Sequence, residues 1–145
     1  MKKAGFEFKE HTADIQVRSW GKTLADAFSQ TAYGLMKIIS PNLEKISPKV
    51  EKRIEIKAED KKALLFDFLS EFLFIFDVNE LIFSQIEVSQ IRKTGSNYEL
   101  IAIVHGEIFD RKKHELGTEV KAITYSFMKI EEKRNNVEIE IVFDI

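Results

Sequence analysis

The sequence contains no cysteine, which excludes disulfides, a thiolate nucleophile and a zinc site built on cysteine ligands. Proline occurs only twice and glycine six times in 145 residues, and no low-complexity linker divides the chain. The phosphate-binding patterns GxGxxG and GxxxxGK[ST] are missing, as is a recognisable serine or threonine nucleophile motif. These absences favour a single domain with no catalytic activity of its own.

Long apolar runs are absent as well. The longest apolar segment, residues 63–78, is interrupted by Asp67, Glu71 and Asp77, and no stretch approaches the roughly 20 apolar residues of a membrane span. The residues after Met1 lack the apolar run of a signal peptide, so we expect a cytoplasmic protein without membrane association. The net charge is −2, whereas nucleic-acid-binding domains usually carry a basic surplus. A protein partner or a cation is therefore a more suitable ligand.

Alternating and helical apolar spacings predict an α+β fold. The predicted strands cover residues 6–8, 14–20, 50–58, 82–91, 98–104, 120–130 and 137–143, with helices from Thr23 to Pro41 and from Asp60 to about Val78. A hairpin turn is predicted at 94–97 and a long loop at 105–118. This order places one strand-helix-strand-strand unit inside another, within a single domain covering residues 1–145.

The second predicted helix has an unusually wide apolar face. Leu64, Phe68 and Phe72 recur at helical spacing, and Phe66 and Phe74 extend the same face. A helix of this kind is typically buried on more than one side. We therefore expect it to form core rather than a cofactor-binding segment.

Two acidic residues at opposite ends of the chain form a candidate cation site. Asp14 opens the second predicted strand and Asp144 follows the last one, and alternation turns both away from the core. They converge if the two strands are adjacent and antiparallel. The α-carboxylate of Ile145 would add another oxygen, and oxygen donors suit calcium or magnesium. The alternative is that both are ordinary exposed acids at strand ends.

Three further residues allow more than one interpretation. His11 could contribute to the site, although a single histidine beside a strand is commonly a hydrogen-bonded structural residue. Lys121 leads a predicted apolar strand face that ends at Phe127, where it could balance the acids, contact a phosphate or snorkel to solvent. Trp20 shares a strand face with Asp14 and could cover the core or anchor a partner.

The chain resembles the archease family nearly from end to end. The resemblance is carried by His11-Thr12-Ala13-Asp14, Trp20-Gly21, the helix at 64–76, Gly106-Glu107, the segment from His114 through Gly117 to Tyr125, and the closing Asp144-Ile145. Together these motifs are specific. The chain departs from the expected family pattern at Ser126, where many members have histidine.

The resemblance implies the nested two-unit fold and a role in tRNA splicing. Archeases assist the RNA-splicing ligase RtcB by promoting its guanylylation and turnover and by altering its nucleotide use, without being ligases themselves. They act on tRNA through the ligase. The family's calcium-type site falls on Asp14, Asp144 and Ile145, where magnesium or manganese would also fit, with His11 and Thr12 beside it. Lys121 matches a residue that the family needs for activation.

Two other functions remain open from the residues alone. An RNA-binding or chaperone-like adaptor in tRNA processing, with purely structural acids, would bind tRNA directly, and its affinity would fall steeply with salt. A metal-dependent hydrolase using Asp14 and His11 would turn over a phosphoester by itself. The missing nucleophile and the small number of ligands argue against the hydrolase.

Overall fold

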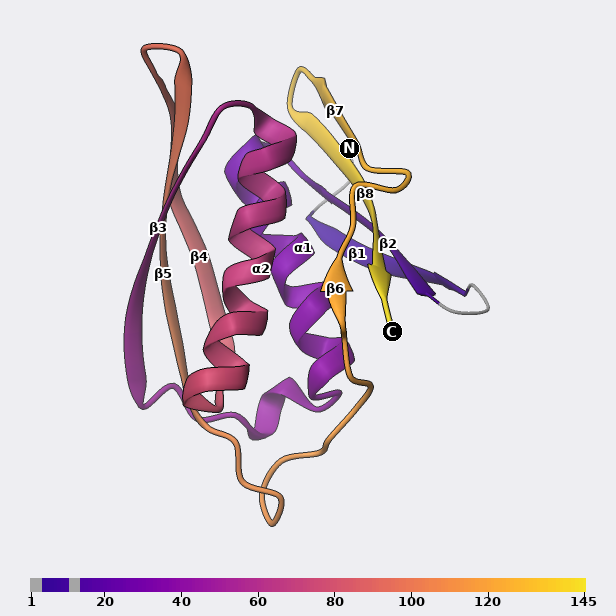
Figure 1. Ribbon diagram of the computed structural model, residues 1–145, viewed down its shortest axis with the longest axis vertical. Coiled ribbons are helices and arrows are strands. Elements are labelled where there is room, and N and C mark those ends of the chain that lie inside the picture. The colour runs from indigo at the N-terminus through magenta and orange to yellow at the C-terminus, as the bar shows by residue number, and fades with distance from the viewer. Residues whose placement is uncertain (1–3, 11–13) are drawn as a thin grey trace.

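The computed structural model describes residues 4–10 and 14–145, with Glu10 described by its backbone only. Helices α1 (Leu24–Ile39) and α2 (Lys61–Asn79) lie between two antiparallel sheets (Figure 1). One sheet contains β1 (Gly5–Glu10), β2 (Asp14–Gly21), β8 (Asn136–Asp144), β6 (Ala122–Ile123) and β7 (Lys129–Lys133). The other contains β3 (Val50–Ala58), β5 (Asn97–Ile108) and β4 (Leu81–Thr94) in that spatial order.

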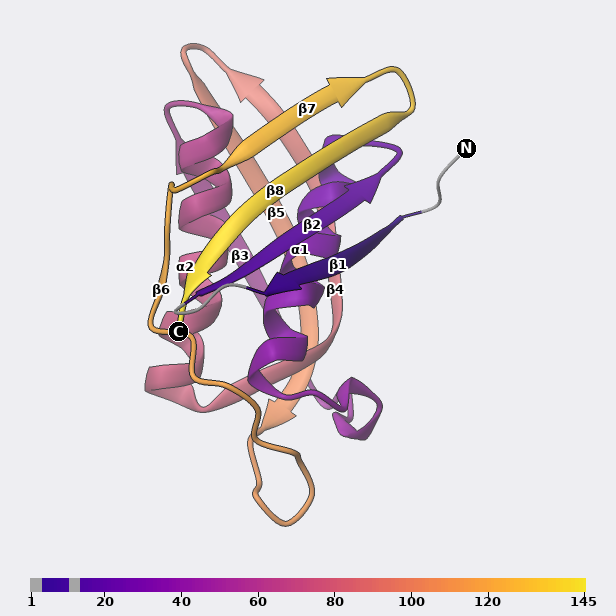
Figure 2. The ribbon, with the colours of Figure 1, turned by 90° about the vertical axis from the view of Figure 1, so that its right-hand side faces the viewer.

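The division into two sheets confirms the predicted nesting of two units in one α+β architecture. The inserted unit, β3-α2-β4-β5, supplies every strand of the sheet with the order β3-β5-β4. The strands before and after this unit supply the other sheet, in which β8 lies between β2 and the short strands β6 and β7 (Figure 2). The first and last parts of the sequence are therefore neighbours in one sheet.

Both helices begin at the residues that the sequence predicts. The Thr23 hydroxyl accepts a hydrogen bond from the backbone N–H of Asp26 at 3.1 Å, and the Asp60 carboxylate accepts one from Ala63 at 2.8 Å. Each cap satisfies a backbone donor that has no partner inside the helix. α1 ends at Ile39, before Pro41, and its sides pack against β2 and β4.

The wide apolar face of α2 is buried between the sheets, as predicted for a core helix. Its fully buried residues include Leu64, Phe68 and Phe72, and the helix packs against β3 and β6. The prediction is wrong for Phe74, which is 59% exposed. Neither α1 nor α2, the α-helices of the described residues, is long and apolar enough to span a bilayer.

Two sequence predictions need correction after β4. β5 continues to Ile108, so the loop begins at 109 rather than at 105. The single strand predicted over 120–130 is instead the short strand β6, a turn, and β7. Phe127 in that turn has a φ of 56°, in the left-handed region, and this conformation breaks the alternation of faces.

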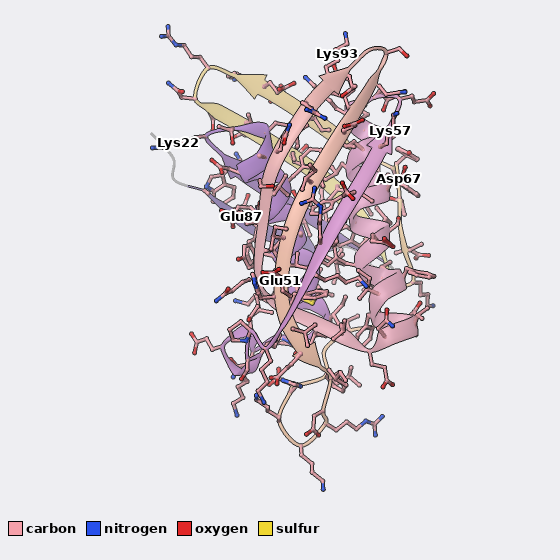
Figure 3. The ribbon with its side chains drawn as sticks, turned by 90° about the vertical axis from the view of Figure 1, so that its left-hand side faces the viewer. Lys22, Glu51, Lys57, Asp67, Glu87 and Lys93 are labelled. Carbon is pink, nitrogen blue, oxygen red and sulfur yellow. The ribbon has the colours of Figure 1, made fainter. Side chains whose placement is uncertain are left out.

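The face of the β3-β5-β4 sheet that points away from the helices carries charged side chains, among them Glu51, Lys57 and Glu87 (Figure 3). Its opposite face contributes Ile54, Leu100 and other apolar residues to the core. One-sided burial of this kind explains the clean alternation of apolar and charged residues along β3.

Candidate metal and partner-binding site

Asp14 and Asp144 lie directly opposite each other where β2 begins and β8 ends. β2 and β8 are antiparallel, and their register pairs Asp14 with Asp144 and Ile15 with Phe143. Residues directly opposite in an antiparallel pair project from the same face of the sheet. The predicted convergence of the two chain ends is therefore confirmed. We call Asp14, Asp144 and Ile145 the acid corner.

The acid corner combines a shielded acid with an exposed one. Asp14 is half-buried, and its Oδ1 atom is almost inaccessible to solvent, whereas Asp144 is exposed. Ile145 packs its side chain against the hydrophobic core, which restrains the backbone at the end of β8. Like charges opposite each other in a sheet repel, so a bound cation would relieve an unfavourable pairing at this corner.

Lys121 lies beside the acid corner through its backbone. Its N–H donates a hydrogen bond to the Asp144 carbonyl at 2.8 Å, and the next residue, Ala122, pairs with Asp144 in the sheet. The Lys121 side chain is exposed and lines a cavity of about 440 Å³ between α2 and residues 116–121. Within the described part of the chain it forms no ion pair. The prediction that Lys121 leads a continuous apolar strand face is wrong, because β6 ends at Ile123.

The donors at the acid corner match the chemistry of a hard divalent cation. Residues 4–10 and 14–145 contain no group of three or more His, Cys, Asp or Glu side chains that could hold a metal ion. The contribution of the Ile145 α-carboxylate as a third oxygen donor beside Asp14 and Asp144 stays a prediction. Oxygen-only donors suit calcium, magnesium or manganese. His11 and Thr12 lie outside the described residues, and their contribution stays a prediction.

A second charged cluster, which the sequence reasoning missed, is buried near the start of the 109–121 loop. Glu107 is 8% exposed and His114 is 4% exposed. The Oε2 atom of Glu107 accepts hydrogen bonds from the Ser47 N–H at 2.8 Å, the Lys113 ammonium at 2.6 Å and the His114 ring at 2.8 Å. Burial alone would raise the pKa of Glu107, but the hydrogen bonds from Lys113, Ser47 and His114 outweigh it and lower the pKa to about 2.

This cluster is structural rather than metal-binding. The Nδ1 atom of His114 accepts a hydrogen bond from the Asp110 N–H at 2.9 Å, so the neutral ring carries its proton on Nε2 and donates to Glu107. Both ring nitrogens are thereby occupied. The sequence placed Glu107 and His114 in a family motif but gave no spacing that would have paired them.

The second half of the same loop is fixed to the end of α1. The Ser40 hydroxyl donates to the Glu115 carbonyl at 2.7 Å, and the Gly117 N–H donates to the Ile39 carbonyl at 2.8 Å. Together with the buried Glu107 cluster, these contacts restrain the loop that leads into Lys121. The loop therefore fixes the position of the Lys121 backbone beside Asp144.

Trp20 and Arg18 occupy the face of β2 that also carries Asp14. The Arg18 guanidinium lies 5.3 Å from the centroid of the Trp20 ring and forms ion pairs with Glu7 and Glu138. The half-buried Trp20 ring covers Gly5, where an added Cβ would lie 2.6 Å from the ring. Trp20 therefore covers the β1–β2 pair, while its role toward a partner stays a prediction.

Comparison with known proteins connects this arrangement to one family. A model of the archease protein family (MTH1598/TM1083) matches residues 6–145. The chain is 45% identical over 126 residues to Protein archease of Thermococcus kodakarensis, and 46% identical over 126 residues to Protein archease of Pyrococcus furiosus, with 87% of each chain covered in both cases. The solution structure of Methanobacterium thermoautotrophicum protein 1598 superposes with a TM-score of 0.82 at 28% identity, covering 97% of this chain and 99% of that one.

Proposed function

Because this chain belongs to the archease family, we propose that it is an accessory protein of tRNA splicing that activates the RNA ligase RtcB. It promotes guanylylation and turnover of the ligase and alters its use of nucleoside triphosphates, without acting as a ligase itself. The observation that supports this most directly is the pairing of Asp14 with the exposed Asp144 where β2 begins and β8 ends. The chain meets tRNA through the ligase.

The acid corner is the proposed cation site. Asp14 and Asp144 supply side-chain carboxylates, and Ile145 supplies its α-carboxylate, held in place by the packing of its side chain against the core. Calcium fits best because it accepts irregular oxygen geometry, and magnesium or manganese are the alternatives. When bound, the cation supplies positive charge that offsets the charge of the triphosphate during guanylyl transfer.

Lys121 is the proposed contact with the partner or its nucleotide. Its backbone is fixed to Asp144, while its side chain is exposed at the rim of a cavity. A flexible ammonium in this position can reach a phosphate brought in by the ligase, or the neighbouring carboxylates. Removing it should weaken activation without changing the fold.

A guanylylation assay with purified RtcB tests the proposal. The parent chain should accelerate formation of the guanylylated ligase, a chelator should remove the effect, and added calcium should restore it. Asp14→Asn and Asp144→Asn should abolish stimulation while remaining folded. Glu87→Gln is the matched control, because Glu87 is an exposed acid on the opposite sheet (Figure 3), and it should stimulate like the parent.

Full stimulation by both aspartate variants would rule out the acid corner as the activating site. Direct tRNA binding by the isolated chain, falling steeply with salt, would favour the adaptor function instead.

The role of the terminal carboxylate can be separated from that of the side chains. Adding one glycine after Ile145 replaces the α-carboxylate at that position with a peptide carbonyl and leaves every side chain intact. We expect calcium binding, measured by isothermal titration calorimetry, to weaken by about ten-fold or more, because one charged oxygen ligand is lost. Unchanged affinity would remove Ile145 from the proposed ligand set.

A further inference from the structure

The turn between β6 and β7 presents two aromatic side chains to solvent. The turn spans Tyr125–Met128 and is closed by a hydrogen bond from the Met128 N–H to the Tyr125 carbonyl at 3.1 Å. Tyr125 is 53% exposed and Phe127 is 78% exposed. Exposed aromatic residues grouped in this way are typical of binding surfaces, where they serve as anchors.

The backbone of this turn is strained at Phe127. This residue occupies the third position of the turn with a φ of 56°, where glycine or asparagine is normally favoured. A phenylalanine there lowers the stability of the fold, because its Cβ crowds the backbone in the left-handed region. The exposed ring recovers little by packing. Strain of this kind, retained without a packing benefit, is a feature of functional positions.

Tyr125 offers one open aromatic face. Its other face stacks on Phe66 of α2, with ring centroids 4.4 Å apart and ring planes 6° apart. The phenol ring also borders an open depression of about 520 Å³ that is lined by Glu59 and Asp67. Asp67 points outward from α2 on the side where β3 ends (Figure 3).

Negative charge dominates around this ring. Burial of the hydroxyl, together with the carboxylates of Asp67, Asp60 and Glu59, raises the pKa of Tyr125. None of these three acids takes part in an ion pair among the described residues. The depression is therefore suited to a cationic group.

Two lysines close in sequence to the residues that line the depression pair with other acids. Lys57 lines it and lies 4.0 Å from Glu99, and Lys61 forms an ion pair with Glu132. These pairings draw the two ammonium groups toward other carboxylates and leave those near Tyr125 available.

We propose that the surface formed by Glu59, Asp67, Tyr125 and Phe127 docks an arginine-bearing segment of a protein partner. A planar guanidinium can stack on the open face of Tyr125 while it donates hydrogen bonds to the carboxylates at the rim. Phe127, two residues further along the turn, contacts an apolar neighbour of that arginine. The acids repel phosphate, so a nucleic-acid strand is the less suitable occupant.

The proposal is tested by NMR titration with the peptide acetyl-Leu-Arg-Gly-Arg-Leu-amide. We expect the amide signals of residues 124–128 to shift, and the matching citrulline peptide to bind about five-fold more weakly or worse. Tyr125→Ala and Asp67→Asn should weaken binding by a similar factor, whereas Tyr125→Phe should retain it. Asp77→Asn, at the far end of α2, is the carboxylate control and should bind like the parent.

Phe127→Gly separates a docking role from a structural one. Relief of the left-handed strain should raise the thermal unfolding midpoint, while loss of the ring should weaken peptide binding. Equal binding of the citrulline peptide, parental affinity in Tyr125→Ala, or no shift in the turn would overturn the proposal. Decauridylate that shifts the same amides as strongly as the peptide would assign the turn to nucleic acid and would also overturn it. These measurements need no ligase, so they stand apart from the proposed activation of RtcB.

Discussion

Glu107 and the pair Asp14 and Asp144 lie in contrasting surroundings. Glu107 is buried among a backbone N–H, an ammonium and an imidazole, and these three groups stabilise its ionised carboxylate. Asp14 and Asp144 instead lie directly opposite each other in the sheet, where like charges repel. The first environment stabilises the fold, and the second is the one in which we propose an external cation.

The Glu107 cluster should make a measurable contribution to stability. Glu107→Gln should lower the free energy of unfolding at pH 7 by about 2 kcal/mol, because it weakens hydrogen bonds to charged and buried donors. Glu51→Gln is the matched control, since Glu51 also contacts a histidine, His105 at 3.0 Å, but is exposed. Its cost should stay below about 0.5 kcal/mol in urea denaturation. Equal costs would contradict the role of burial.

The same cluster predicts a pH dependence. The pKa of Glu107 is lowered from 4.5 to about 2 in the folded protein, so its ionised form adds stability above pH 4.5. That contribution is lost as the pH falls from 4.5 toward 2, where the carboxylate becomes protonated in the folded state too. The stability difference between the parent and Glu107→Gln should therefore shrink over this range. A difference independent of pH between 7 and 2.5 would show that the charge is not involved.

Residue-level reasoning from the sequence found one of these environments and missed the other. Asp14 and Asp144 could be placed together on the condition that the strands they open and close are antiparallel neighbours, and the structure meets that condition. Glu107 and His114 could not, because their contact depends on the path of an irregular loop that no periodicity describes. The only signal was that both belong to the motifs shared with the archease family.

At the scale of elements, the loop from 109 to 121 links the buried cluster to the acid corner. Gly117 packs closely against the end of α1, and a Cβ added there would lie 2.2 Å from the Ile38 carbonyl oxygen. Gly117→Ala should therefore displace the segment that leads into Lys121 and reduce stimulation of the ligase. Gly95→Ala is the control, because Gly95 has a φ of 64° and nothing within 4 Å of an added Cβ.

Both glycine variants should lose stability, but for different reasons. Gly95→Ala should cost about 1 kcal/mol through backbone strain at a hairpin tip, with ligase stimulation intact. Gly117→Ala should lose stimulation beyond what its loss of stability explains, at temperatures where both variants are fully folded by circular dichroism. Equal stimulation by the two variants would mean that the loop does not position Lys121.

The region after Lys121 shows why one element prediction failed. Alternating apolar residues up to Phe127 are typical of a strand, and the sequence contains no glycine or proline there to suggest a turn. The turn depends on a tertiary contact, the stacking of Tyr125 on Phe66, and on a left-handed phenylalanine. Neither has a local signature, whereas the caps at Thr23 and Asp60 do, and those were predicted correctly.

At the scale of the whole molecule, the nested topology makes the acid corner a junction between the two ends of the chain. β2 and β8 are separated by the entire inserted unit in sequence, yet they are neighbours in one sheet. A cation bound by both strands can form its full set of contacts only when this sheet is assembled. Binding should therefore stabilise the folded state as a whole.

This coupling predicts that the relative stability of the parent and the Asp144→Asn variant differs between chelator and calcium. In chelator, Asp144→Asn should be as stable as the parent or slightly more stable, by less than about 1 kcal/mol, because it removes a charge opposite Asp14. At a calcium concentration of about 100 times the dissociation constant, the parent should gain about 2.7 kcal/mol and the variant much less. Glu140→Gln, on the same face of β8, should gain as much as the parent. Urea denaturation in the two media measures each difference, and an unchanged order would show that these acids hold no cation.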